Sequence, residues 1–287
     1  MKLEEDFMKR VVACIDSSPC INALAEAAAW IAKETNRELV LLQVLDYYPA
    51  SYHLGEISGV IGFESNAMLL KELAELEQKQ SELAIDYSNN LLNHISEMIQ
   101  EKHAIVPVQI QEKGDFLEQS MHVLREDDIA LIGRLGERSA ERKKHLGSNV
   151  ENFIRNANCT VMTVGETFKP PTRFIFAYEY SPTCLKMMKR VAQSDLLRIL
   201  QCHLLYVGDH PEILKEPEAF LKDAGLDVIT EYRYGDVSEE ILSYQKEHGI
   251  QLILLGAFSH SKVKQFFLGS ITTSIFRNTE VPLMVAK

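Results

Sequence analysis

Short apolar runs rich in Val, Ile and Leu alternate along the chain with segments of helical periodicity. The runs ELVLLQVL (residues 38–45) and QLILLG (residues 251–256) contain almost no polar alternation. Runs of this kind are typical of parallel strands that are covered on both faces. The alternation of strand and helix patterns therefore predicts an α/β fold built from doubly wound parallel sheets with right-handed crossovers.

The same succession of elements occurs twice. RVVACIDSSPC (residues 10–20) matches RFIFAYEYSPTC (residues 173–184), and further matched segments follow in the same order in both halves. An ordered internal repeat indicates a duplicated unit. The stretch 165–173 has two prolines and no apolar periodicity, so it is predicted to be a linker. We therefore predict two domains, residues 1–166 and 172–287, each with a five-stranded sheet.

The halves differ mainly in residues 47–104, which the first half inserts after its second strand. A Tyr- and Gly-rich loop leads to a predicted long helix from about Ser65 to Lys102. The pattern favours a crossover helix that packs on its own sheet, while a coiled-coil or partner-binding role stays open. Its apolar positions recur at spacings of three, four and seven: Leu73, Leu76, Leu83, Tyr87, Leu91, Ile95 and Met98.

Cap residues predict where several helices begin. Ser18-Pro19 is a cap residue followed by a first-turn proline, which predicts the start of the first helix. Gly114-Asp115 and Gly235-Asp236 each stand between a strand and a helix. An aspartate at such a position is more often an N-cap or a first-turn charge than a catalytic base.

Glycines follow one apolar run in each half. Gly133 follows residues 129–132, and Gly256 follows residues 252–255. A glycine turn that leads from a strand to a helix leaves N–H groups unpaired, and these groups with the helix dipole favour a phosphate. Ligands of open α/β sheets bind beyond the carboxyl ends of the strands, at the switch point. The alternative is that these glycines only allow tight packing between strand and helix.

The glycine stretches resemble the G-x2-G-x9-G-[S/T] signature of nucleotide-binding universal stress proteins. Together with the strand–acid–Ser-Pro start and the repeat, the chain resembles a tandem universal stress protein. The resemblance covers nearly all of the chain outside residues 47–104. It implies two flavodoxin-like (adenine nucleotide alpha hydrolase-like) sheets packed as a pseudo-dimer. It also implies an adenine nucleotide of the ATP or AMP type as ligand, with or without Mg²⁺.

The resemblance carries over to candidate cofactor-binding residues in the first half. Asp16 ends the first strand, where nucleotide-binding relatives place an acidic residue near the nucleoside or its metal. The main chain at Val44 matches the segment that recognises adenine. Ten residues stand between the second and third glycines, where the signature has nine. The matching stretch comprises Gly133, Gly136, Gly147, Ser148 and Asn149.

In the second half the spacing matches but other positions differ. Ser259 stands where the signature has its second glycine, and Glu179-Tyr180 replaces the usual small Asp-Gly type pair. Tyr180 is expected to occlude a base, so the first half is the preferred site. The matching stretch comprises Gly256, Gly269, Ser270 and Ile271.

Charge and composition narrow the classes of partner. The net charge of −11 and the pI of about 5.4 argue against a general nucleic-acid or anionic-membrane binder. No apolar run reaches the ~18 residues of a membrane span, and the polar start is no secretory signal. Arg134 and the basic residues within 138–144 make this stretch locally positive. The positive charge would suit a triphosphate; the alternative is that these side chains simply face solvent.

The cysteines and histidines show no metal-ligand spacing, so we expect no metal site. Three of the five cysteines lie inside apolar runs, as small core residues do, which favours a reduced, cytoplasmic compartment. No G-x-S-x-G elbow, kinase motif set or paired carboxylates are found, and no residue qualifies as catalytic.

The sequence therefore predicts a stress-response protein that works by binding an adenine nucleotide. One alternative is a scaffold with vestigial sites that acts through protein partners, and a slow ATPase ranks third. We also expect residues 160–164 and 282–286, the last strand of each half, to pair in an intramolecular pseudo-dimer. Homodimerisation of whole chains, through the long helix or another exposed face, stays open.

Overall fold

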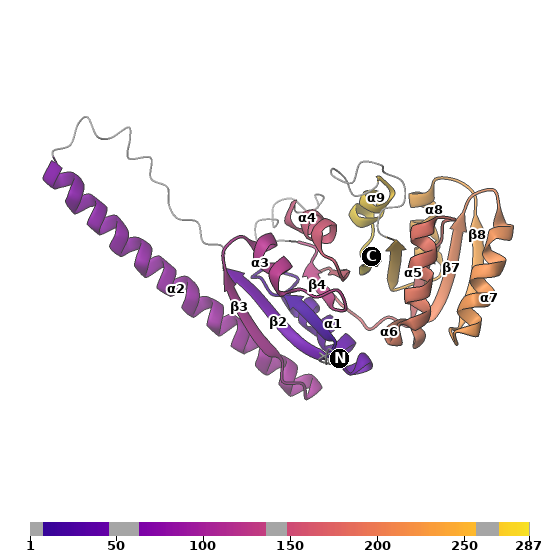
Figure 1. The fold of residues 1–287 in the computed structure, drawn as a ribbon, viewed down its shortest axis with the longest axis horizontal. Helices are drawn as coiled ribbons and strands as arrows, with labels where there is room; N and C mark the ends of the chain where they lie inside the picture. The colour runs from indigo at the N-terminus through magenta and orange to yellow at the C-terminus, as the bar shows by residue number, and fades with distance from the viewer. Residues whose placement is uncertain (1–7, 46–62, 136–147, 257–269, 287) are drawn as a thin grey trace, which may run out of the picture.

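The computed structural model describes residues 8–45, 63–135, 148–256 and 270–286. Within these residues the strands form one ten-stranded sheet (Figure 1) in the order β3-β2-β1-β4-β5-β10-β9-β6-β7-β8. The strands are β1 Arg10–Cys14, β2 Glu38–Leu45, β3 Val108–Lys113, β4 Ile129–Gly133, β5 Thr160–Val164, β6 Arg173–Ala177, β7 Gln201–Val207, β8 Val228–Arg233, β9 Leu252–Gly256 and β10 Leu283–Ala286. Each half contributes five parallel strands in the same order, as the repeat predicts.

The described helices cover both faces of this sheet. Two buried apolar clusters, one from each face, contain residues of both halves, so the two faces are continuous from end to end. One cluster draws on α1 Ile21–Thr35, α2 Phe63–His103, α5 Pro182–Gln193, α6 Asp195–Arg198 and α7 Lys215–Asp223. The other draws on α3 Phe116–Val123, α4 Ser148–Asn156, α8 Val237–Glu247 and α9 Ser270–Asn278. A short 3-10 turn, η3 Pro211–Leu214, precedes α7.

The two halves meet where β5 pairs with β10, and this pair is antiparallel. Met284 lies opposite Met162, and Val285 lies opposite Val161. These side chains are buried, so the pair hides both apolar surface and the edge N–H and C=O groups that each half would otherwise expose. Pro282, which has no N–H to donate, stands just before β10. The predicted pseudo-dimer of last strands is confirmed.

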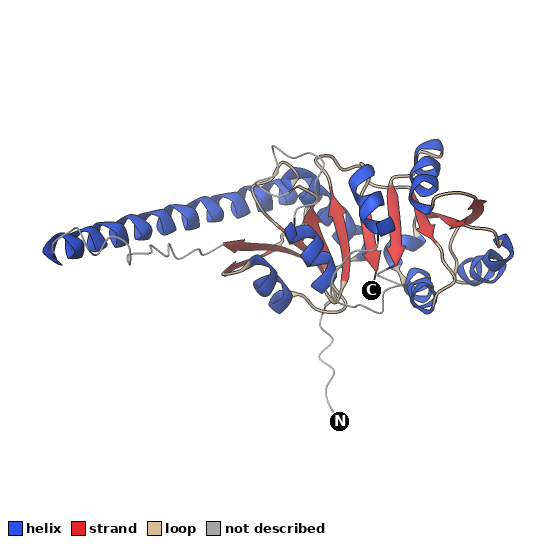
Figure 2. Cartoon of the chain, turned by 90° about the horizontal axis from the view of Figure 1, so that it is seen from above, coloured by secondary structure: helices blue, strands red, loops and turns tan. Residues whose placement is uncertain are grey.

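The long helix α2 begins and ends close to the predicted residues, but only part of it is a crossover helix. Its C-terminal part packs on the sheet through Leu92, Ile95 and Ile99, which are fully buried. The Ser88 hydroxyl, also buried, donates to the side-chain oxygen of Gln43 on β2. The preceding half projects beyond the sheet (Figure 2). The prediction that the whole helix packs on its own sheet is therefore wrong for its N-terminal half, because the sheet ends near Ser88.

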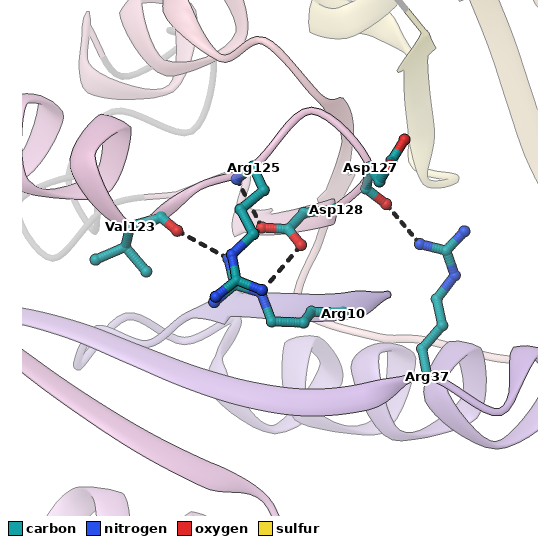
Figure 3. A network of polar contacts seen from close by, with 6 residues as sticks. All are labelled: Arg10, Arg37, Val123, Arg125, Asp127 and Asp128. Atoms are coloured by element: carbon teal, nitrogen blue, oxygen red, sulfur yellow. Dashed lines mark hydrogen bonds and ion pairs between the residues drawn. The ribbon is translucent and has the colours of Figure 1, made fainter. Parts of the chain in front are cut away.

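A buried ion pair closes the amino ends of β1 and β4 (Figure 3). The Arg10 guanidinium donates to both carboxylate oxygens of Asp128, at 2.6 and 3.1 Å, and to the carbonyl of Val123 at 2.8 Å. The backbone N–H of Arg125 donates to the same carboxylate at 2.8 Å. This network lies at the opposite edge of the sheet from Gly133, so its role is to fix the two central strands of the first half.

Both Gly-Asp pairs begin helices as predicted. The Asp115 carboxylate accepts the backbone N–H of Glu118 at the start of α3, and Asp236 accepts those of Ser238 and Glu239 at the start of α8. These aspartates are N-caps in the structure.

Candidate functional site

The carboxyl ends of β1 and β4 form the switch point of the first half. The two strands are neighbours, with Cys14 opposite Ile132. β1 leads into α1, which covers one face, whereas the segment after β4 leads to α4 on the other face. Crossovers that leave to opposite faces open a crevice between the two strand ends, which is where ligands of doubly wound sheets bind.

The turn after β1 brings Asp16 and Ser18 to this crevice. The backbone N–H of Ser18 donates to the Asp16 carboxylate at 3.2 Å, which shapes the turn. Ser18 is only 2% exposed, and its hydroxyl has no hydrogen-bond partner among the described residues. A buried hydroxyl left unpaired costs about 1–3 kcal/mol, so such groups call for an explanation.

The predicted start of the first helix is wrong. α1 begins at Ile21 after Cys20, and no side chain caps it. Ser18 contributes only its carbonyl, which accepts the N–H of Ile21 at 3.2 Å. The Ser-Pro pair therefore does not act as a cap here, and this is why the Ser18 hydroxyl is unpaired.

Gly133 ends β4 directly against this turn. A Cβ at Gly133 would lie 3.1 Å from the Cβ of Cys20 and 3.3 Å from the hydroxyl oxygen of Ser18. The glycine is therefore needed for close packing, which supports the alternative reading of that residue. It also means that the Ser18 hydroxyl faces the backbone of Gly133, where no side chain blocks the approach of a ligand.

Cys20 lies at the same crevice as Ser18 and Gly133. Sequence reasoning missed both Cys20 and the unpaired hydroxyl of Ser18. Burial raises the pKa of the Cys20 thiol, while the backbone N–H groups of Leu135 and Arg134 act in the opposite direction. The thiol thus lies at the N–H groups that follow Gly133. The signal that could have found both residues is the repeated Ser-Pro pair with a cysteine close behind it, since Cys184 follows Ser181 by three residues where Cys20 follows Ser18 by two.

Arg134 does not point toward this crevice. Its guanidinium donates to the carbonyl oxygens of Thr279 and, at 2.9 Å, of Val281, just before β10. The same group lies 5.0 Å from the ring centroid of Phe276 on α9. The expectation that Arg134 adds to a cationic cluster for a triphosphate is wrong, because backbone carbonyls and an aromatic ring of the other half hold its charge.

The equivalent turn of the second half is internally satisfied. The Ser181 hydroxyl accepts the N–H of Cys184 at 3.1 Å and caps α5, as a Ser-Pro start predicts. It also donates to the Glu179 carboxylate at 3.0 Å. Gly256 has only ordinary contacts, 3.5 Å from Met187, where a Cβ would stand. Tyr180 is 73% exposed, so it packs against little of the described chain.

The remaining candidates lie at other strand ends or outside the described residues. Ser270 and Ile271 belong to the opposite edge of the ten-stranded sheet, because the two halves run antiparallel. Val44 is near the end of β2, opposite Glu112 of β3. Ser148 and Asn149 begin α4, and Ser270 and Ile271 begin α9, with Asn149, Ser270 and Ile271 exposed. The helices that follow β4 and β9 thus begin at Ser148 and Ser270. Gly136, Gly147, Ser259, Gly269 and the basic residues 138–144 are outside the described residues.

A shallow hollow of about 550 Å³ lies between α1, α2 and the segment after β5. Two of the charged side chains that line it are paired, since Glu26 binds Lys102 at 2.7 Å and also contacts His103 at 2.8 Å. Burial raises the pKa of Glu26, but hydrogen bonds from these two residues bring it below its ordinary value. We assign no ligand to this hollow.

The described residues lack two further kinds of feature. They contain no cluster of three or more His, Cys, Asp or Glu side chains arranged to hold a metal ion. Nor do they include a helix with both the length and the apolar character that crossing a membrane requires.

Comparison with known proteins identifies the family. The model of the universal stress protein family matches residues 8–165 and 212–287. The chain belongs to the universal stress protein family. It is 30% identical over 285 residues to the universal stress protein Slr1230 of Synechocystis sp., covering 96% of this chain and 99% of that protein. Both halves of this chain are therefore matched by one relative of similar length.

Solved structures of universal stress proteins share the fold. One from Archaeoglobus fulgidus has a TM-score of 0.72 at 18% identity, covering 97% of this chain and 98% of its own. A putative universal stress protein from Pseudomonas aeruginosa has a TM-score of 0.60 at 12% identity, covering 98% and 94%. At these identities the likeness concerns the fold, and it supports the tandem α/β architecture.

Proposed function

We propose that this universal stress protein binds an adenine nucleotide of the ATP or AMP type at the first-half switch point. In this proposal it acts in a stress response through binding rather than through catalysis. The observation that carries the proposal is the buried, unpaired hydroxyl of Ser18 facing Gly133 between the ends of β1 and β4. A phosphate oxygen would accept a hydrogen bond from this hydroxyl.

The surrounding residues fit a nucleotide in other respects. Asp16 lies at the same strand end, where a carboxylate would accept from ribose hydroxyls or hold Mg²⁺. The main chain at Val44 ends the neighbouring strand and would face the base. Because Ser18 is only 2% exposed, the proposal requires a small shift of the turn at Gly133 when the ligand binds.

The second half is proposed as a vestigial site. Its matching serine hydroxyl is held by both the N–H of Cys184 and the Glu179 carboxylate, so no unpaired donor faces Gly256. The scaffold alternative, in which neither half binds nucleotide, makes the opposite prediction for the first half.

A pair of matched variants tests this assignment by isothermal titration with ATP and AMP, with and without Mg²⁺. Ser18→Ala should weaken nucleotide binding about tenfold, which corresponds to one hydrogen bond to a charged group. The same change should leave the free energy of unfolding equal or higher, because it removes an unpaired buried hydroxyl. Ser181→Ala should lower the free energy of unfolding by about 1 kcal/mol through loss of a cap and leave the affinity unchanged.

Two further results would decide between the candidates. At ~100 times its Kd, ATP should stabilise the native chain by about 2.7 kcal/mol. Nucleotide released from the denatured, purified protein should be identified by mass spectrometry. Absence of both the stabilisation and the released nucleotide would overturn the proposal in favour of the scaffold. An affinity loss in Ser181→Ala instead of Ser18→Ala would move the site to the second half.

A further inference from the structure

The projecting half of α2 carries an exposed apolar stripe. Leu76, Leu83 and Tyr87 are 56%, 69% and 60% exposed, and they are spaced by seven and four residues. Leu73, half-buried, precedes Leu76 by one turn. Scattered exposed leucines need no explanation, but a row at heptad spacing on one helix is typical of a helix–helix interface.

The stripe is not the face that packs on the sheet. Ser88, Leu92, Ile95 and Ile99 form the buried face of the C-terminal half. At about 100° of rotation per residue, the exposed stripe lies roughly 120° around the helix from that face. A helix that no other described element covers over this length is only marginally stable, so a partner for the stripe would also stabilise it.

We propose that the stripe of one chain packs against the same stripe of a second copy, with the two α2 helices antiparallel. The observation that selects this partner and this orientation is the pair Lys79 and Asp86, both exposed beside the stripe. If Leu76 lies opposite the second copy's Tyr87, Lys79 comes beside the second copy's Asp86. The twofold symmetry of the pair repeats this contact, so two complementary charge pairs flank the apolar centre.

A parallel pair lacks this complementarity. In register, it would place Lys79 beside Ala84 of the second copy, with no ion pair. An antiparallel pair also sends the two ten-stranded sheets to opposite ends of the joined helices. Figure 2 shows the projecting half clear of its own sheet, so the sheet does not obstruct this arrangement.

The size of the contact sets its strength. The residues from Lys71 to Ser88 give an overlap of about 25 Å, which is at the lower end of what a specific interface of ~1,000 Å² requires. Acidic residues such as Glu72, Glu75 and Glu82 also outnumber the lysines of this segment. The dimer should therefore depend on concentration, in contrast to the permanent β5–β10 junction within each chain.

Sedimentation velocity of the full chain over a wide range of concentrations tests the proposal. Leu83→Glu should raise the dimer dissociation constant at least tenfold, because it places two charges in the apolar centre. Ala74→Glu adds the same charge on a different exposed face of α2, and it should change the constant by less than about threefold. Circular dichroism confirms that both variants keep the helix.

A charge exchange identifies the orientation. Lys79→Glu and Asp86→Lys should each weaken self-association about three- to tenfold, since each sets like charges opposite one another. An equimolar mixture of these two variants should associate as well as the original chain, because every pair across the interface is then opposite in sign. The proposal is overturned by a chain that stays monomeric at all concentrations, by a dimer indifferent to Leu83→Glu, or by a mixture that does not recover.

Discussion

The guanidinium of Arg134 donates to the carbonyl oxygen of Val281, 2.9 Å away, and so ties the end of β4 to the turn before β10. This contact crosses from one half to the other. Arg134→Met should lower the free energy of unfolding by about 2 kcal/mol, because carbonyls of the second half lose charged donors. Arg277→Met, on the exposed face of α9, is the matched control and should change stability by less than about 0.5 kcal/mol. Equal effects in urea denaturation would contradict the proposed role of Arg134.

The pair Arg10–Asp128 predicts a strongly asymmetric mutational response. Arg10→Met leaves the buried Asp128 carboxylate without its cation, and should cost about 3–5 kcal/mol. Replacing both residues with apolar side chains of similar size, Arg10→Met with Asp128→Leu, should recover a large part of that loss. The measurement is a double-mutant cycle in denaturant. If the double variant were no more stable than Arg10→Met alone, the loss would come from packing and not from the unpaired charge.

Residues 1–168 on their own should form a homodimer. Without the second half, β5 exposes its edge together with the apolar side chains Val161 and Met162. A second copy of β5 can take the place of β10, because both strands lie at the same position in matching halves. Light scattering measures the mass of the fragment in solution. A folded fragment that remained monomeric at high concentration would argue against edge pairing as the main force at this junction.

His203 predicts a loss of stability in mild acid. Burial lowers its pKa below the ordinary value of 6.5, with His248 and Arg173 acting in the same direction. The native chain therefore keeps the imidazole neutral while the unfolded chain takes up a proton near pH 6.5. Stability is unaffected by this group above that pH and falls progressively below it.

The variant His203→Phe, which keeps a ring beside Tyr244, should remove this contribution. Free energies of unfolding are compared for the two chains between pH ~5 and ~7. The difference between them should shrink or reverse as the pH falls. Two parallel profiles would show that another group causes the acid sensitivity.

The fold could be predicted from the sequence because burial dominates folding. The apolar runs indicate which segments are buried, and the internal repeat indicates that the same buried elements occur twice. The pairing of the last strands followed from the same reasoning about unsatisfied edges. Side-chain directions could not be predicted in this way. Nothing in the glycine stretch shows that Arg134 turns toward Thr279 and Val281, because the cause is the position of the other half.

In the candidate site, too, side-chain contacts could not be predicted from the sequence, as two matched serines show. Ser18 and Ser181 stand in nearly identical Ser-Pro contexts, yet only Ser181 caps its helix. The difference depends on where each helix begins, and α1 begins two residues later relative to its proline than α5 does. For α2, periodicity located the apolar positions correctly. It could not show that the sheet ends near Ser88 and leaves Leu76 and Leu83 exposed.

The two halves that meet at the β5–β10 junction belong to one covalent chain, and this changes the constraints on the sequence of each half. A subunit that meets its partner by diffusion has to retain a surface that fits every other copy of itself. Here residues 165–172 hold the partner strand at a high effective concentration, whatever the abundance of the protein. Substitutions in one half need only suit the single neighbour to which it is attached. Under that condition one copy of a duplicated loop can drift in sequence while the other is maintained, and the two-half sheet survives the asymmetry.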